Sequence, residues 1–148
     1  MAVNADELSE ITKIELRVDS ESHNLQTTGE LLPGLKSLKL NDSVVHCFRD
    51  LGTSFQQLRV LHLARCGLTE VQGIQAFQLL TELFLSFNFL NDLFDISMLP
   101  ELEVLDLEGN CFAELSELTY LKRLTNLTDL SLRNNPVCAN HEFLPMVT

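Results

Sequence analysis

Leucine and other apolar residues recur along the chain in one spaced pattern, L-x-x-L-x-L-x-x-N/C-x-L. Five copies fit the pattern, beginning at Leu35, Leu58, Leu80, Leu102 and Leu127, and a degenerate copy from Ile11 to Asp19 precedes them. The central apolar residues of the six copies are Ile14, Leu38, Leu61, Leu83, Leu105 and Leu130. They are separated by 24, 23, 22, 22 and 25 residues, so one structural unit is repeated along the chain.

Each position of the repeat has a physical reason. The L-x-L pair alternates with period two, which predicts a short strand with its leucines on one face and excludes a heptad coiled coil. The Asn or Cys position turns the chain, and its side chain can bond buried backbone groups of the neighbouring loop. Cys66 can do this only weakly through its thiol. The later apolar residues are spaced by about three, which predicts tight helical returns.

These features predict an α/β fold, a leucine-rich repeat solenoid with short parallel strands on the concave face and 3-10 or short helical returns on the convex face. No single repeat can bury both of its inner faces, so stacking of neighbours supplies the core. Residues 11–137 are predicted to form about five to six repeats, following an N-terminal helical cap over residues 1–10. The L-x-L leucines are predicted to line up on adjacent strands.

The two ends of the repeat array are less regular. Asn4 or Asp6 is predicted to begin the N-terminal helix. The polar stretch from Asp19 to Gly29 is predicted to be a loop. Residues 138–148 are too few for a full repeat and are predicted to form an incomplete C-terminal cap or tail. In the minimal-cap alternative, Phe143 and Leu144, with Met146 beside them, fold over the last repeat.

The net charge and the cysteine spacing exclude several classes of function. The net charge of −11 and the pI of about 4.6 argue against binding nucleic acid or an anionic membrane surface. No apolar run approaches the roughly 20 residues that a membrane span needs, so no membrane insertion is expected. The four cysteines lie in different repeats without a C-x-x-C pair, and no signal peptide precedes them, so they are expected to be reduced cytosolic thiols. No metal site, cofactor or catalytic residue is predicted, because neither His46–Cys47 nor His62 with Cys66 has an orienting third group.

Side chains that alternate with the buried leucines are expected to face outward on the concave surface, which is the usual binding face of such a solenoid. Phe84 lies between Leu83 and Leu85, so we expect its ring to be an exposed anchor for a protein partner. Phe87 either joins this surface or packs into the turn. The acidic residues either meet a basic partner or form a solvated face. The predicted protein-binding residues are His62, Arg65, Phe84, Phe87, Asp106 and Glu108.

Between the leucines, the sequence resembles the leucine-rich repeat-containing protein 56 family. The resemblance extends from about Leu8 to Val137, and its most specific part is DLGTS followed by L-x-V-L-x-LARCGL, from Asp50 to Leu68. LKLNDS, TELFLSFNFLNDL and LEVLDLEGN also match. Generic repeat proteins share the leucines but lack Arg65-Cys66-Gly67 after that lead-in.

This resemblance implies a non-catalytic factor of the cytoplasm and the cilium or flagellum. Its implied role is the assembly of outer dynein arms and their intraflagellar transport, with dynein-arm or transport components as partners. Family members continue beyond the last repeat into a cap and a long tail, so the resemblance also implies a short or truncated form. The alternative is a general short-repeat adaptor, such as a phosphatase-regulatory or axonemal light-chain-like repeat protein.

Overall fold

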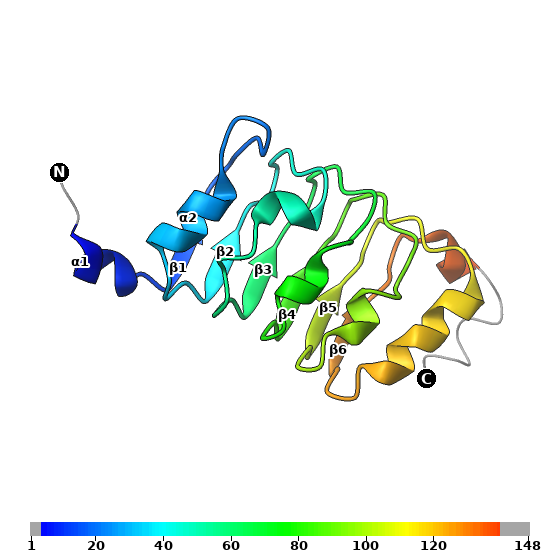
Figure 1. Cartoon of the computed structure of the whole chain (residues 1–148). Coiled ribbons are helices and arrows are strands. Elements are labelled where there is room, and N and C mark those ends of the chain that lie inside the picture. Colours follow the sequence, from blue (N-terminus) through cyan, green and yellow to red (C-terminus); the bar gives the residue numbers. More distant parts are fainter. Residues whose placement is uncertain (1–3, 140–148) are drawn as a thin grey trace.

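The chain folds as a curved stack of repeats in a computed structural model, which describes residues 4–139. Figure 1 shows the strands following one another along the stack, with the helical segments on the opposite side. The elements are α1 (Ala5–Ser9), β1 (Lys13–Glu15), α2 (Leu25–Leu31), β2 (Ser37–Lys39), η1 (Phe48–Leu51), β3 (Val60–His62), η2 (Ile74–Ala76), β4 (Glu82–Phe84), η3 (Ile96–Met98), β5 (Val104–Asp106), η4 (Leu115–Arg123), β6 (Asp129–Ser131) and η5 (Pro136–Ala139).

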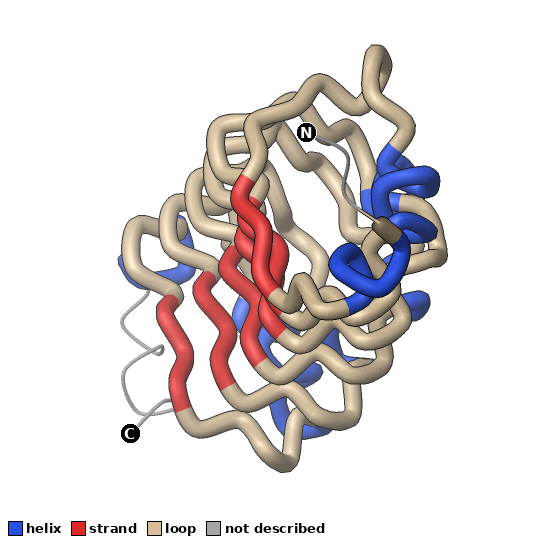
Figure 2. Tube along the Cα trace, turned by 90° about the vertical axis from the view of Figure 1, so that its left-hand side faces the viewer, coloured by secondary structure: helices blue, strands red, loops and turns tan. Residues whose placement is uncertain are grey.

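The six strands form one parallel sheet in sequence order, β1 to β6. The register pairs Ile14 with Leu38, Leu38 with Leu61, and so on to Leu105 with Leu130. The predicted alignment of the repeat leucines is therefore confirmed. Figure 2 shows the strands on one side of the stack and helices on the other, as the predicted solenoid requires.

The core lies between the sheet and the helical returns. Leu38, Leu61 and Leu83 are fully buried, and each stacks on its counterpart in the next repeat. From the convex side, Phe48 and Phe77 meet edge-on at a centroid distance of 6.0 Å. Each repeat thus fills the space that its neighbour leaves open, which is why a solenoid needs stacking to be stable.

Asparagine side chains hold successive turns together. The amide N–H groups of Cys66 and Leu68 donate to Asn88 Oδ1 at 3.0 and 3.1 Å. Asn88 Nδ2 donates in return to the carbonyls of Leu63 and Leu85, both at 2.9 Å. Asn110 and Asn135 repeat this arrangement, whereas Cys66 bonds the carbonyl of Leu40 through its thiol at 3.1 Å. The predicted role of this repeat position is confirmed.

The predicted loop from Asp19 to Gly29 is wrong in its second half, where α2 begins. The side chain of Asn24 caps this helix by accepting the N–H of Thr27 at 3.3 Å. Leu25 is buried and anchors the helix to the core. Gly29 packs so closely on the next repeat that a Cβ at this position would lie 2.7 Å from the Cβ of Ser54. The first return is therefore an α-helix despite its polar sequence.

At the N-terminal end, α1 begins with a capping box. Asn4 Oδ1 accepts the N–H of Glu7 at 2.9 Å, and the Glu7 carboxylate accepts the N–H of Asn4 at 3.3 Å. None of the helix's residues is fully buried, and the half-buried Leu8 packs against the core. Phe143, Leu144 and Met146 of the predicted C-terminal cap lie outside the described residues.

Candidate functional site

Three of the predicted binding residues lie in one row across the middle of the sheet. The register places His62 beside Phe84 and Phe84 beside Asp106, on β3, β4 and β5. All three are half-buried, because their side chains leave the sheet on the face opposite the buried leucines. Alternation along each strand therefore forms a continuous strip of outward side chains on the concave face.

His62 and Phe84 form a flat aromatic surface at the centre of this strip. Their rings stack with centroids 4.3 Å apart and an interplanar angle of 4°. Each ring covers one face of the other, and the stack leaves the Phe84 ring only half-buried. A rigid, partly exposed aromatic side chain loses little conformational freedom on binding, which suits an interface anchor.

His62 is uncharged at neutral pH. Burial lowers its pKa below the ordinary 6.5, and the nearby charges of Lys39 and Lys13 lower it further, against an opposing effect of Glu15. The centre of the concave face is therefore an apolar, aromatic surface rather than a cationic one.

Acidification is expected to destabilise the folded chain through His62. Because the pKa of His62 is lower in the folded than in the unfolded chain, the unfolded state takes up the proton first as pH falls. This contribution to stability is fully present above the ordinary value of 6.5 and is lost below it. The His62→Phe variant lacks this titration, so its Tm should fall less than that of the wild type between about pH 7 and about pH 5. Equal falls in Tm would contradict the assignment.

Arg65 and Phe87 lie on the rim of the sheet, just beyond the ends of β3 and β4. Both have left-handed backbone conformations, with φ of 55° and 58°, as do Asp42 and Asn134 at the same repeat position. Arg65 pairs with Asp42 through two contacts of 2.6 and 3.1 Å, and this pair lowers the pKa of Asp42. Both partners are exposed, so the contacts fix the position of Arg65 more than they stabilise the fold.

Phe87 shows features of both alternatives, because it is partly exposed and its ring also packs over the turn of the next repeat. Its side chain is 47% exposed, and its ring lies over Gly109, where a Cβ would overlap it. A bulky residue in the left-handed region costs about 1–2 kcal/mol, so the surrounding turn must hold it there. The N–H of Phe87, which donates to the carbonyl of Glu108 at 2.7 Å, is one such restraint.

Glu108 turns toward the last repeat, where its Oε1 accepts the side-chain amide of Asn134 at 3.1 Å. The six predicted residues thus divide into a central row of His62, Phe84 and Asp106 and a rim that includes Arg65 and Phe87.

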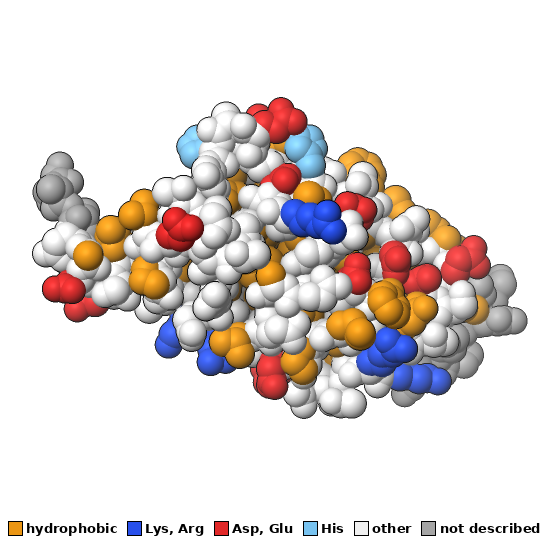
Figure 3. Space-filling view, in the orientation of Figure 1, with side chains coloured by type: hydrophobic (Ala, Val, Ile, Leu, Met, Phe, Trp, Pro, Cys, Tyr) orange, Lys and Arg blue, Asp and Glu red, His pale blue; other side chains and the backbone are white. Residues whose placement is uncertain are grey.

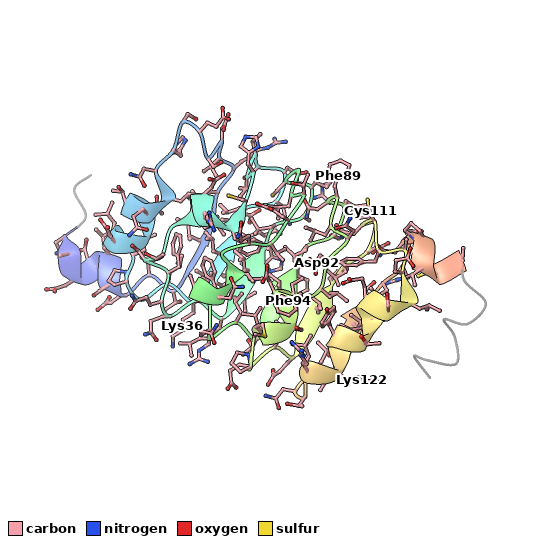
Figure 4. All side chains as sticks on the ribbon, turned by 45° about the vertical axis from the view of Figure 1, so that its right-hand side comes forward. Lys36, Phe89, Asp92, Phe94, Cys111 and Lys122 are labelled. Atoms are coloured by element: carbon pink, nitrogen blue, oxygen red, sulfur yellow. The ribbon has the colours of Figure 1, made fainter. Side chains whose placement is uncertain are left out.

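Exposed aromatic residues also occur outside the concave face, where sequence reasoning did not place them. Phe89 is 61% exposed, and in Figure 4 it lies with Cys111 at the upper edge of the stack. On the helical side, the guanidinium of Arg123 lies 5.7 Å from the Phe94 ring centroid and 5.4 Å from that of Tyr120. Figure 3 shows hydrophobic side chains beside basic ones on this side, toward the C-terminal end. The cluster of phenylalanines in FLSFNFLNDLF is the one sequence signal for these positions.

Of the two cysteines considered as nucleophiles, Cys66 is held in its neutral form. Burial raises the pKa of Cys66, and its thiol donates to the Leu40 carbonyl. Among residues 4–139, no group of three or more His, Cys, Asp or Glu side chains is arranged to hold a metal ion. Within the same part of the chain, no helix has the length and hydrophobicity needed to span a membrane.

Comparison with known proteins identifies the repeats. No family model matches the chain. The rat leucine-rich repeat-containing protein 56 is 47% identical over 133 residues, which are 90% of this chain and 24% of the rat protein. The human protein is 44% identical over the same share of each chain. The chain belongs to the leucine-rich repeat-containing protein 56 family. A homolog from Trypanosoma brucei brucei is 35% identical over 78% of this chain and 16% of its own length.

The chain spans about a quarter of the length of the mammalian family members that it matches. Solved structures place the fold of this family region among leucine-rich repeat proteins. Internalin C2 of Listeria monocytogenes superposes with a TM-score of 0.70 at 25% identity, covering 90% of this chain and 56% of internalin C2. A leucine-rich repeat protein of Leptospira interrogans gives 0.73 at 25% identity, covering 87% and 33%. The predicted fold class and the predicted family are therefore both confirmed.

Proposed function

We propose that this chain is a non-catalytic docking scaffold for the assembly of outer dynein arms and their intraflagellar transport in motile cilia. Its partner is a dynein-arm or transport component bound on the concave face. Membership of the leucine-rich repeat-containing protein 56 family supports the cellular role. The observation that supports the binding mode is the ordered, half-exposed His62–Phe84 stack at the centre of a parallel sheet.

The geometry favours protein binding at this surface for two reasons. The outward strand residues are contributed by every repeat, so a partner can contact several strands at once. The stack is aromatic and uncharged, whereas its flanking strands carry charged side chains. An aromatic centre with a polar surround is the arrangement in which a few residues supply most of the binding energy.

Truncation of Phe84 tests the binding surface. The Phe84→Ala variant is expected to bind its partner about five- to thirtyfold more weakly, which corresponds to about 1–2 kcal/mol for a central anchor. Its circular dichroism should be unchanged, because Phe84 lies outside the leucine core. The matched control is Phe89→Ala, which removes the same side chain from the upper edge and should retain partner binding.

The measurement is affinity purification from ciliated cells with wild type, Phe84→Ala and Phe89→Ala as bait, followed by titration of the recovered partner. Enrichment of dynein-arm or transport components by the wild type and Phe89→Ala, but not by Phe84→Ala, is the expected result. Absence of those components from the wild-type sample would refute the ciliary role. Recovery of a phosphatase instead would favour the general-adaptor alternative. Equal recovery by all three baits would show that the partner binds elsewhere.

A further inference from the structure

The two halves of the concave face carry opposite charge. On β1 and β2 the outward strand residues include Lys13 and Lys39, with Glu15 as the one acidic residue, for a net charge of +1. On β4, β5 and β6 they include Glu82, Asp106 and Asp129, for a net charge of −3. The chain as a whole has a net charge of −11, so the positive charge of the first half is opposite in sign to that of the whole chain.

The boundary between the two halves is the aromatic stack. His62 on β3 and Phe84 on β4 are neighbours in the register, and they separate Lys39 from Asp106 in the same row. The row therefore runs from a cation through two stacked rings to a carboxylate. The ion pair of Lys39 with Glu15 is long, at 3.9 Å, and both side chains are exposed, so the ammonium group remains available to a partner.

The acidic half also contains a hollow. A shallow, open depression of about 230 Å³ lies over β5 and β6 and is lined by Val104, Leu105, Asp106, Asp129, Leu130 and Ser131. One water molecule takes up about 30 Å³ in the liquid, so the hollow has room for a side chain. Within the described part of the chain, the buried Ser131 hydroxyl oxygen has no hydrogen-bond partner. The carboxylates of Asp106 and Asp129 beside the apolar Val104 side chain suit the charged end and the long stem of a lysine or arginine side chain.

We propose that the concave face is bipolar and binds a segment of a partner protein that is acidic at one end, apolar or aromatic in the middle and basic at the other. The acidic end lies over β1 and β2, the middle lies on the His62–Phe84 stack, and a basic side chain enters the hollow between β5 and β6. This inference rests on the proposed use of the concave face for docking, and it specifies the chemistry of the partner.

The dimensions of the sheet fit a short segment. Neighbouring strands lie about 4.8 Å apart, so β2 and β5 are separated by roughly 14 Å. An extended chain advances about 3.3 Å per residue and covers that distance in about four residues. A peptide of about nine residues therefore reaches both charged halves at once. A uniformly basic segment of that length would place positive charges against Lys13 and Lys39, and a uniformly acidic one would meet the three carboxylates.

The test uses three labelled nine-residue peptides, each with a central tryptophan. One carries two glutamates at one end and two lysines at the other, the second carries four lysines, and the third carries four glutamates. Fluorescence anisotropy with the full chain should show the bipolar peptide binding about fivefold tighter than either uniform peptide, the size expected of a few exposed ion pairs. Equal binding of all three peptides, or no binding of the bipolar one up to about 1 mM, would overturn the proposal.

Charge reversal gives a sharper test on the protein side. Lys13→Glu with Lys39→Glu makes both halves acidic, and Glu82→Lys with Asp129→Lys makes both halves basic. Each double variant should bind the bipolar peptide about five- to tenfold more weakly. The first should now prefer the four-lysine peptide and the second the four-glutamate peptide. Asp106 is left unchanged because its Oδ1 accepts the N–H of Glu108 at 3.0 Å.

A quadruple variant that combines the two pairs of substitutions separates the effect of charge order from that of total charge. It carries −3 on the first half and +1 on the second, so its net charge equals that of the wild type while the order is reversed. A flexible peptide can bind in the opposite direction, and the quadruple variant should therefore regain tight binding of the bipolar peptide. Continued weak binding by a variant with unchanged circular dichroism would contradict a bipolar face.

Failure of this inference can be told apart from failure of the proposed function. If Phe84→Ala loses the cellular partner while the charge-reversal variants keep it, the docking role of the concave face is supported and its bipolar chemistry is refuted. If the charge-reversal variants distinguish the peptides as expected but Phe84→Ala retains the cellular partner, the inferred chemistry of the face is supported and the proposed docking role is refuted.

Discussion

The Leu83→Ala variant should lose about 2–5 kcal/mol of unfolding free energy, because truncation of a buried leucine removes its transfer energy and leaves a cavity. Leu83 is fully buried, and the register places it between Leu61 and Leu105 on the two adjacent strands. The cavity therefore opens in the middle of the stack. Since each repeat depends on its neighbours, the loss weakens two interfaces at once.

Urea denaturation followed by circular dichroism measures this loss for Leu83→Ala. The matched control is Leu31→Ala, which makes the same truncation at a leucine that is 54% exposed on α2 and should change stability by less than about 0.5 kcal/mol. If the two variants unfolded at the same urea concentration, the strand leucines would not form the continuous core described above.

The repeat leucines were predictable from the sequence because their signal is local and periodic. Alternation within each L-x-L unit fixed which side chains face inward, and the constant spacing fixed which of them become neighbours. The same alternation placed Phe84 on the outer face. These features follow from strand geometry and need no knowledge of distant contacts.

Other features depend on contacts that the local pattern does not contain. The helix α2 forms because Leu25 enters the core and Gly29 fits against Ser54 of the next repeat, so its polar sequence alone suggested a loop. Phe87 sits at a position occupied by Asp42, Arg65 and Asn134 in other repeats, and its left-handed backbone became evident only from the turn geometry. Likewise, the opposite charges of the two concave halves become evident only when the strands are placed side by side, because each half combines charged residues from separate repeats.

The Asn110→Ala variant should lose about 3 kcal/mol or more, because one substitution would leave several buried backbone groups without partners. Asn110 Oδ1 accepts the N–H of Leu90 at 3.0 Å, and Nδ2 donates to the carbonyls of Leu85 and Leu107, both at 3.0 Å. Each unsatisfied group costs about 1–3 kcal/mol, and water cannot reach the site while the turns remain stacked.

Two comparisons isolate the hydrogen-bond contribution of Asn110. Cys66→Ala at the equivalent repeat position removes thiol contacts alone, so its loss of unfolding free energy should be smaller, at about 1 kcal/mol. Asn126→Ala removes an exposed amide that donates to the carbonyl of Pro100 at 3.2 Å, and its effect should be within about 0.5 kcal/mol. Equal losses in urea denaturation for Asn110→Ala and Asn126→Ala would show that the amides do not join the turns. The ranking Asn110, Cys66, Asn126 follows because the cost depends on how many buried backbone groups each side chain satisfies.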